Sequence, residues 1–214
     1  MLGGVIGMVM IRLRQRTLRF HLQLKQRLDL FHYLTTLDDY RRLIERFLGF
    51  YGPVEAALEK HFSRGAGGFD FEPRKKVPML VSDLRALGVK DLAALPRCAA
   101  LPTIEAPSHA YGCLYSLEIA TLGGQIVARH LNRALGVGPG SGCSFFDSYG
   151  DQAVSMWHDF SQQIKKYAVT GEIEEAMIRA AIETFIRLEQ WMTDKDVSER
   201  PQQRLKLVAG GRSA

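Results

Sequence analysis

Two adjacent glycines, Gly123 and Gly124, lie inside a stretch whose apolar residues recur at helical spacing. Ile126, Val127 and Leu131 follow the pair on the same pattern of three and four residues. Each glycine costs a helix roughly 0.5–1 kcal/mol relative to alanine, so the pair costs about 1–2 kcal/mol. A helix that tolerates this cost presses its backbone against something flat or bulky. The pattern leaves open whether that neighbour is a planar ligand or another helix.

Helical periodicity extends through most of the 214 residues, and no segment alternates with a period of two. The sequence therefore predicts an all-α protein with one domain. We expect a disordered leader at residues 1–11, a helical domain at residues 12–193 and a flexible tail at residues 194–214. The main helices are expected at residues 13–31, 37–58, 77–87, 108–135, 151–164 and 170–193, with Ser108 and Thr170 as N-caps.

Composition excludes several classes of partner and site. The net charge of +5 is modest, and no dense run of Lys and Arg suggests binding to nucleic acid. The apolar first eleven residues are too short to span a membrane and lack the features of a signal peptide. The three cysteines are widely spaced without a CxxC motif, which favours neither zinc nor disulfides. A reducing, cytoplasmic location is the simplest interpretation.

His21 lies on the mostly apolar face of the first predicted helix, together with Thr17 and Leu24. Such a histidine is either a core residue with satisfied hydrogen bonds or a ligand to a metal or haem. The helix with the glycine pair carries no obvious ligating side chain opposite it. A flat iron macrocycle would fit between the two helices, ligated on one face and open to dioxygen on the other.

Five short motifs strengthen this hypothesis. In chain order they are Leu13-Arg14-x-x-Thr17-x-x-x-His21, Phe50-Tyr51-Gly52-Pro53-x-Glu55, Gly112-x-x-Tyr115-x-x-Glu118-x-x-x-Leu122-Gly123-Gly124-Gln125, Trp157-x-x-Phe160 and Thr184-Phe185. Their order and spacing over residues 12–192 resemble those of the biliverdin-producing haem oxygenases. The Tyr-x-x-Glu form before the glycine pair is most similar to the bacterial, bacteriophytochrome-associated branch.

The resemblance implies a helical bundle with haem sandwiched between a proximal and a distal helix. His21 would be the proximal iron ligand, and the backbone at Gly123 and Gly124 would close over the macrocycle. No side chain is expected to act as a catalytic acid or base. Haem b would be both cofactor and substrate, cleaved with dioxygen and electrons to biliverdin, carbon monoxide and ferrous iron. The further residues expected to bind the cofactor are Arg14, Thr17, Tyr115, Ile119 and Phe185.

The resemblance also implies partners and exposes two departures from the family's pattern. A ferredoxin- or flavodoxin-type protein would supply electrons, and a bacteriophytochrome is a candidate receiver of biliverdin. Ile119 stands where the family usually has glycine, and Ala120 where many animal members have aspartate. Ile119 supports the alternative of a haem- or tetrapyrrole-binding protein without turnover. Lys165 or Lys166 would join Arg14 in pairing the propionates, or else belong to a solvated helix face.

Overall fold

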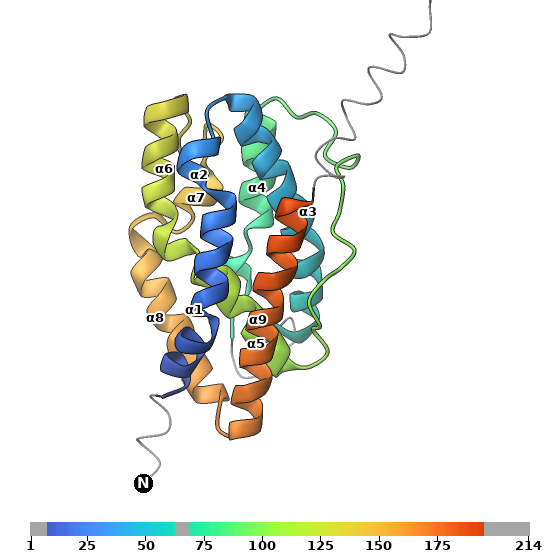
Figure 1. The fold of residues 1–214 in the computed structure, drawn as a ribbon, viewed down its shortest axis with the longest axis vertical. Coiled ribbons are helices and arrows are strands. Elements are labelled where there is room, and N and C mark those ends of the chain that lie inside the picture. Colours follow the sequence, from blue (N-terminus) through green and yellow to red (C-terminus); the bar gives the residue numbers. More distant parts are fainter. Residues whose placement is uncertain (1–7, 63–68, 195–214) are drawn as a thin grey trace, which may run out of the picture.

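The computed structural model describes residues 8–62 and 69–194, and within these ranges the chain is an all-α bundle without strands (Figure 1). The fold class expected from periodicity is therefore confirmed. None of the described helices combines the length and the apolar character needed to cross a membrane. In chain order the helices are α1 (Met8–Leu28), α2 (Leu30–Tyr33), α3 (Leu37–Phe62), η2 (Glu72–Arg74), α4 (Val77–Ala86), α5 (Pro107–Glu118), α6 (Thr121–Leu135), α7 (Ser144–Asp147), η3 (Gly150–Gln152), α8 (Ala153–Tyr167) and α9 (Gly171–Thr193).

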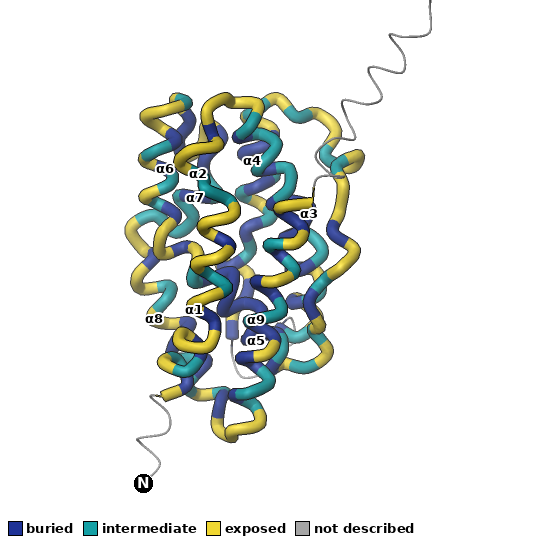
Figure 2. Tube along the Cα trace, in the orientation of Figure 1, coloured by how far each residue is buried: buried dark blue, intermediate teal, exposed yellow. Residues whose placement is uncertain are grey.

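Helix α5 forms the centre of the bundle, and Figure 2 shows it almost entirely buried. Its most extensive partner is α9. The two backbones come so close that a Cβ atom on Gly112 would lie 2.1 Å from the carbonyl oxygen of Met177. The Ser116 hydroxyl also donates a hydrogen bond to the Ala181 carbonyl at 2.9 Å. Gly112 is thus required by close helix packing and not by backbone conformation.

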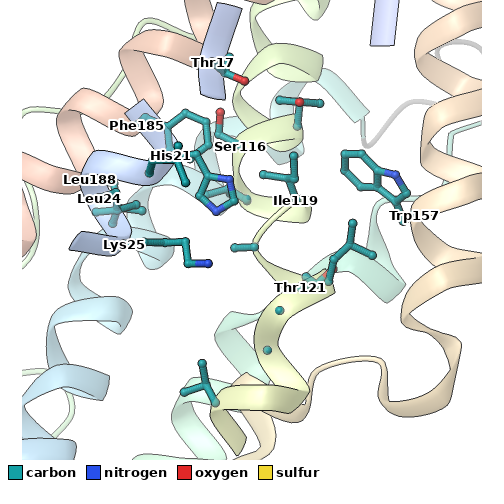
Figure 3. Close-up of a pocket in the computed structure, with 18 of the residues that line it drawn as sticks. Thr17, His21, Leu24, Lys25, Ser116, Ile119, Thr121, Trp157, Phe185 and Leu188 are labelled. Atoms are coloured by element: carbon teal, nitrogen blue, oxygen red, sulfur yellow. The ribbon is translucent and has the colours of Figure 1, made fainter. Parts of the chain in front are cut away.

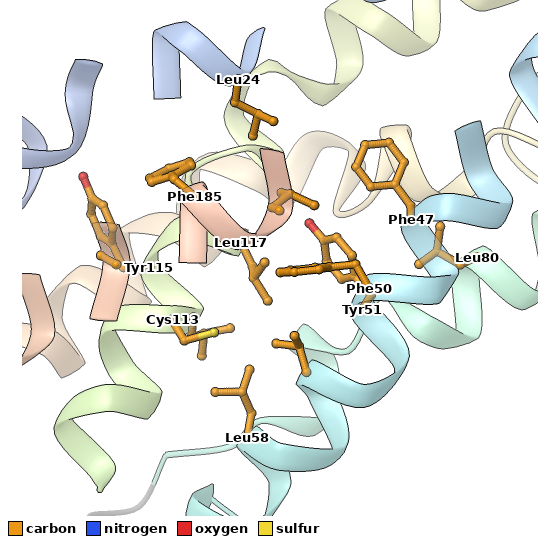
Figure 4. Packing of buried hydrophobic residues seen from close by; sticks show 14 of the residues in the cluster. Leu24, Phe47, Phe50, Tyr51, Leu58, Leu80, Cys113, Tyr115, Leu117 and Phe185 are labelled. Carbon is orange, nitrogen blue, oxygen red and sulfur yellow. The ribbon is translucent and has the colours of Figure 1, made fainter. Parts of the chain in front are cut away.

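Helix α3 passes through Pro53 and contributes Phe50, Tyr51 and Leu58 to the core shown in Figure 4. Proline has no N–H group, so the carbonyl of Gly49 loses its partner within the helix. The N–H group of Cys98 donates to this oxygen at 2.9 Å. A segment outside the helix therefore satisfies the acceptor that proline leaves free.

The first helix has different limits from those expected. It begins at Met8, where Val9 is only 1% exposed and belongs to the core. It ends at Leu28 and not at residue 31, because Asp29 adopts the left-handed conformation with φ of 32° before the short helix α2. Residues 1–7 and 195–214 lie outside the described residues, so a disordered leader and a flexible tail stay predictions there.

The single helix expected over residues 108–135 is wrong, because the structure has two helices, α5 and α6, with Ile119 and Ala120 in a turn between them. The Thr121 hydroxyl donates to the Glu118 carbonyl at 2.7 Å. A hydroxyl that binds a nearby carbonyl in this way bends a helix. The start also differs, because Ala106 occupies the N-cap and Ser108 lies within α5, whereas Thr170 caps α9 as expected by accepting from the Ile173 N–H.

Gly112→Ala should lower the free energy of unfolding by about 1–3 kcal/mol, because the added methyl group must push α5 away from α9. Gly171→Ala is the matched control, since a Cβ atom there meets nothing within 4 Å. Urea denaturation of both variants checks this. Equal stability of the two variants would contradict the close approach of α5 and α9.

Candidate haem-binding site

A cavity of about 1130 Å³ lies between α1, the junction of α5 and α6, and α8 (Figure 3). This volume is slightly above the roughly 300–1,000 Å³ usual for ligand sites. Most of the lining is apolar, with Phe185 and Leu188 from α9, Trp157 from α8, and Phe47 from α3. The cavity therefore suits a large, flat and mostly apolar ligand.

His21 contributes its imidazole to this cavity from α1. In Figure 3 the ring points toward the junction of α5 and α6. Phe185 stacks on it with the ring centroids 5.6 Å apart and the planes inclined by 16°. Burial and the charge of Lys25 lower the pKa of His21, which favours the neutral ring near pH 7. Within the described residues no hydrogen bond occupies either ring nitrogen, so one is available to a metal ion.

The two glycines have different neighbours, so both explanations left open by the sequence apply. A Cβ atom on Gly124 would lie 2.2 Å from the carbonyl oxygen of Phe146, so this glycine is needed for packing against α7. A Cβ atom on Gly123 would meet nothing within 4 Å. Both residues line the cavity, and Gly123 leaves open space beside the backbone of α6. The described surroundings of Gly123 are those expected of a helix that faces a ligand.

Four polar residues are gathered along the same cavity. Arg14 and Thr17 reach it from α1, Tyr115 from α5, and Lys165 from α8. Arg14 is exposed, whereas the Tyr115 hydroxyl is buried and has no hydrogen-bond partner in the described part of the chain. Lys166, the other candidate for a propionate partner, is exposed and lies outside the cavity lining. Of the two candidate propionate partners, Lys165 therefore lies on the wall of the cavity and Lys166 does not.

Ile119 lies in the turn between α5 and α6 and is half-buried. It lines the cavity and also packs against the core. In Figure 3 it lies across the cavity from His21. Ala120 lines the cavity too but carries no polar group. The side of the cavity opposite the imidazole is thus apolar and narrowed by a branched side chain.

A buried polar cluster holds the end of α5 and was not predicted from the sequence. Glu118 accepts hydrogen bonds from the Arg74 guanidinium at 2.8 Å and from the Tyr149 hydroxyl at 2.5 Å. Arg74 also donates to the Met156 carbonyl at 3.1 Å, which links the cluster to α8. Glu118 thus connects the end of α5 to the segment before α4 and to the loop before η3. The sequence Arg74-Lys75-Lys76 has the composition of a solvent-facing basic run, and nothing in it signals burial.

Glu55 does not belong to the hydrogen bonds around Glu118 but binds the backbone before α4. Its carboxylate accepts the backbone N–H groups of Lys76 at 2.6 Å and of Val77 at 3.2 Å. Burial raises its pKa to about 7, against the lowering effect of these hydrogen bonds. Glu55 therefore fixes the start of α4.

The side chains around the cavity suit a metal that is already bound in a macrocycle, and not a bare metal ion. No group of three or more His, Cys, Asp or Glu side chains among residues 8–62 and 69–194 could hold a bare metal ion. One neutral imidazole is sufficient for iron that brings its own planar nitrogen ligands. The apolar walls, the open face at Gly123 and the cations Arg14 and Lys165 match a flat dianionic ring. The described residues thus fit haem.

An all-helical fold with one free imidazole beside a flat cavity defines a class of helical haem proteins. The family model described as Heme oxygenase matches residues 8–194, and the chain therefore belongs to the haem oxygenase family. A comparison with curated proteins finds no match. Membership implies a haem-binding, haem-degrading protein for which haem is both ligand and substrate.

Gly124→Ala should lower the free energy of unfolding by about 1–3 kcal/mol, because its methyl group would overlap the Phe146 carbonyl. Gly123→Ala, the adjacent control, should be neutral or stabilise the fold by up to about 1 kcal/mol through helix propensity. Chemical denaturation without ligand measures both. If Gly123→Ala were the more damaging change, the assignment of the two faces would be reversed.

Proposed function

We propose that this chain is a biliverdin-producing haem oxygenase, which cleaves haem b with dioxygen and electrons to biliverdin, carbon monoxide and ferrous iron. The observation that carries the proposal is the placement of His21 and Gly123 on the walls of one cavity. A neutral imidazole supplies the iron ligand, and bare backbone leaves room for the ring.

Each residue of the site then has a defined task. His21 holds the iron, and Phe185 fixes the plane of the imidazole by stacking on it. Arg14 and Lys165 pair with the propionates, while Thr17 and Tyr115 offer hydroxyl groups beside them. Bound haem supplies the iron that activates dioxygen for cleavage of its own ring. The apolar lining excludes bulk water, and the backbone at Gly123 and Gly124 borders the reacting face.

The partners follow from the chemistry and the surface. Electrons have to come from another protein, and we infer a ferredoxin- or flavodoxin-type donor. Helix α1 presents exposed cations for an acidic partner, among them Arg14, Arg19 and Lys25. A bacteriophytochrome that takes up biliverdin, membership of the bacterial branch and a cytoplasmic location belong to the same proposal. The resemblance of the Tyr115-x-x-Glu118 motif supports the first two.

One observation favours a second candidate, a haem- or tetrapyrrole-binding protein that does not turn over. Ile119 stands opposite His21 in place of the glycine usual in the family. Its branched side chain occupies space that dioxygen and ordered water need during ring cleavage. Binding of haem would survive this change, whereas turnover would not.

His21→Ala should abolish the six-coordinate ferric spectrum of the hemin-loaded protein and weaken hemin binding by at least about tenfold, because the iron loses its protein ligand. Added imidazole should restore the spectrum. His130→Ala is the control, since His130 lies on α6 outside the cavity lining and contacts Phe31. An unchanged spectrum in His21→Ala would show that another group ligates the iron.

Under air and with a reductant, the hemin-loaded wild-type protein should lose its Soret band while the red absorption of biliverdin grows. Ile119→Gly should turn over at least as fast, because it frees space opposite His21. Absorption spectroscopy with chromatography of the extracted pigment measures both. No verdin from the wild type, together with verdin from Ile119→Gly, would establish the binding protein and refute the oxygenase.

A further inference from the structure

Lys76 is a buried lysine whose ammonium group faces the Tyr149 ring and Glu118 without making a hydrogen bond to either. The residue is 3% exposed, and its Nζ atom has no hydrogen-bond partner among the described residues. It lies 3.6 Å from the centroid of the Tyr149 ring and 3.7 Å from an oxygen of Glu118. An ammonium group has three donors, and burying it without hydrogen bonds is costly. These two contacts leave the donors of the ammonium group without an acceptor among the described residues.

The two carboxylates near Lys76, those of Glu118 and Glu55, already accept hydrogen bonds from other groups. Both oxygens of Glu118 accept hydrogen bonds, one from Arg74 and one from Tyr149. The carboxylate of Glu55 accepts the backbone N–H group of Lys76, not its ammonium. Arg74 and Lys76 face Glu118 and Glu55, and burial raises the pKa of Glu55 to about 7. The cluster therefore carries excess positive charge whenever Glu55 is protonated.

Lys76 also belongs to the lining of the haem-sized cavity. It reaches the cavity from the segment before α4, as Tyr51 does from α3, and not from the helices α1 and α6 that flank the site. The other Lys and Arg side chains of the described lining, which are Arg14, Lys25 and Lys165, are exposed or only half-buried. Lys76 is thus the buried cation of the described lining, in surroundings of low dielectric where its charge acts strongly.

We propose that Lys76 is the anion-stabilising residue of this cavity, whose buried ammonium charge favours small negatively charged ligands in the site. The inference deepens the proposed function and rests on it where the iron serves as reporter. Negative charge that develops on oxygen during haem cleavage is what such a group stabilises. Lys76 then acts from the segment before α4, whereas His21 acts from α1.

Burial lowers the pKa of Lys76 to about 8, while Glu118 and Glu55 oppose that shift and Arg74 adds to it. The ammonium form dominates at pH 7 and disappears as the pH rises through about 8. Burial also raises the pKa of Tyr51, so its hydroxyl stays neutral in this range. Anion binding should therefore weaken above pH 8 together with the charge of Lys76.

The test uses azide with the hemin-loaded ferric protein. Lys76→Met should weaken azide binding about tenfold at pH 7, because the ligand loses the attraction of a nearby buried positive charge. Lys76→Arg should stay within about threefold of the wild type. Lys75→Met is the control, since Lys75 pairs with Glu59 and Glu72 outside the cavity lining. Carbon monoxide, a neutral ligand of the ferrous protein, should bind equally to all four proteins.

If Lys76 only stabilised the fold, Lys76→Met would change the Tm and leave azide affinity unchanged. The proposal predicts the opposite. Glu118 keeps Arg74 as its cationic partner at 2.8 Å when Lys76 is replaced, so no buried charge is left unpaired. Lys76→Met should therefore keep the Tm of the wild type while azide affinity falls. The fall in azide affinity above pH 8 should be smaller in Lys76→Met than in the wild type. Unchanged azide affinity and unchanged pH dependence in a folded Lys76→Met would overturn the proposal.

A measurement on the protein without haem keeps this inference separate from the proposed function. Side-chain amine NMR, assigned by comparison with Lys76→Arg, should show one lysine that titrates near pH 8 and shifts when azide is added. If hemin does not bind but this lysine responds, the haem assignment fails and the anion site stands. If Lys76 titrates like an exposed lysine and ignores azide, the anion site is refuted.

Discussion

The break between α5 and α6 is the constraint on which the rest of the structure depends. Three close approaches fix it: Gly112 against the Met177 carbonyl, Gly124 against the Phe146 carbonyl, and Glu118 between Arg74 and Tyr149. None of these neighbours can move without opening the core. The turn directs α6 across the imidazole of His21. The backbone of α6 at Gly123 forms a wall of the cavity, with open space beside it. Helix packing therefore shapes the site before any ligand enters.

The sequence predicted much of this fold because helical periodicity and apolar faces are local properties. His21 could be found on its stripe, and the cost of two glycines indicated a close neighbour at α6. The break at Ile119 could not be found, because both turn residues keep right-handed helical dihedrals and neither is glycine or proline. Arg74 and Lys76 were missed for another reason. Their burial depends on Glu118 and Tyr149, which lie far away in the chain and meet them only in the folded bundle.

The cavity combines features that act against each other. Its walls are apolar and exclude water, yet Lys76 places a cation among them. Ile119 narrows the space opposite His21. Dioxygen and ordered water need this space during ring cleavage, whereas a protein that only binds haem does not need it. A buried ammonium without hydrogen bonds costs stability. The proposed function of Lys76 is to stabilise negative charge in the cavity.

The central claim is that haem lies between α1 and α6 with its iron held by the first of these helices. Anomalous diffraction at the iron edge from crystals of the hemin-loaded protein tests it most directly. The account predicts one strong iron peak in this cavity, bonded to a ring nitrogen of His21, with Gly123 on the opposite side of the ring. An iron peak outside the cavity, or one bonded to a different side chain, would contradict it.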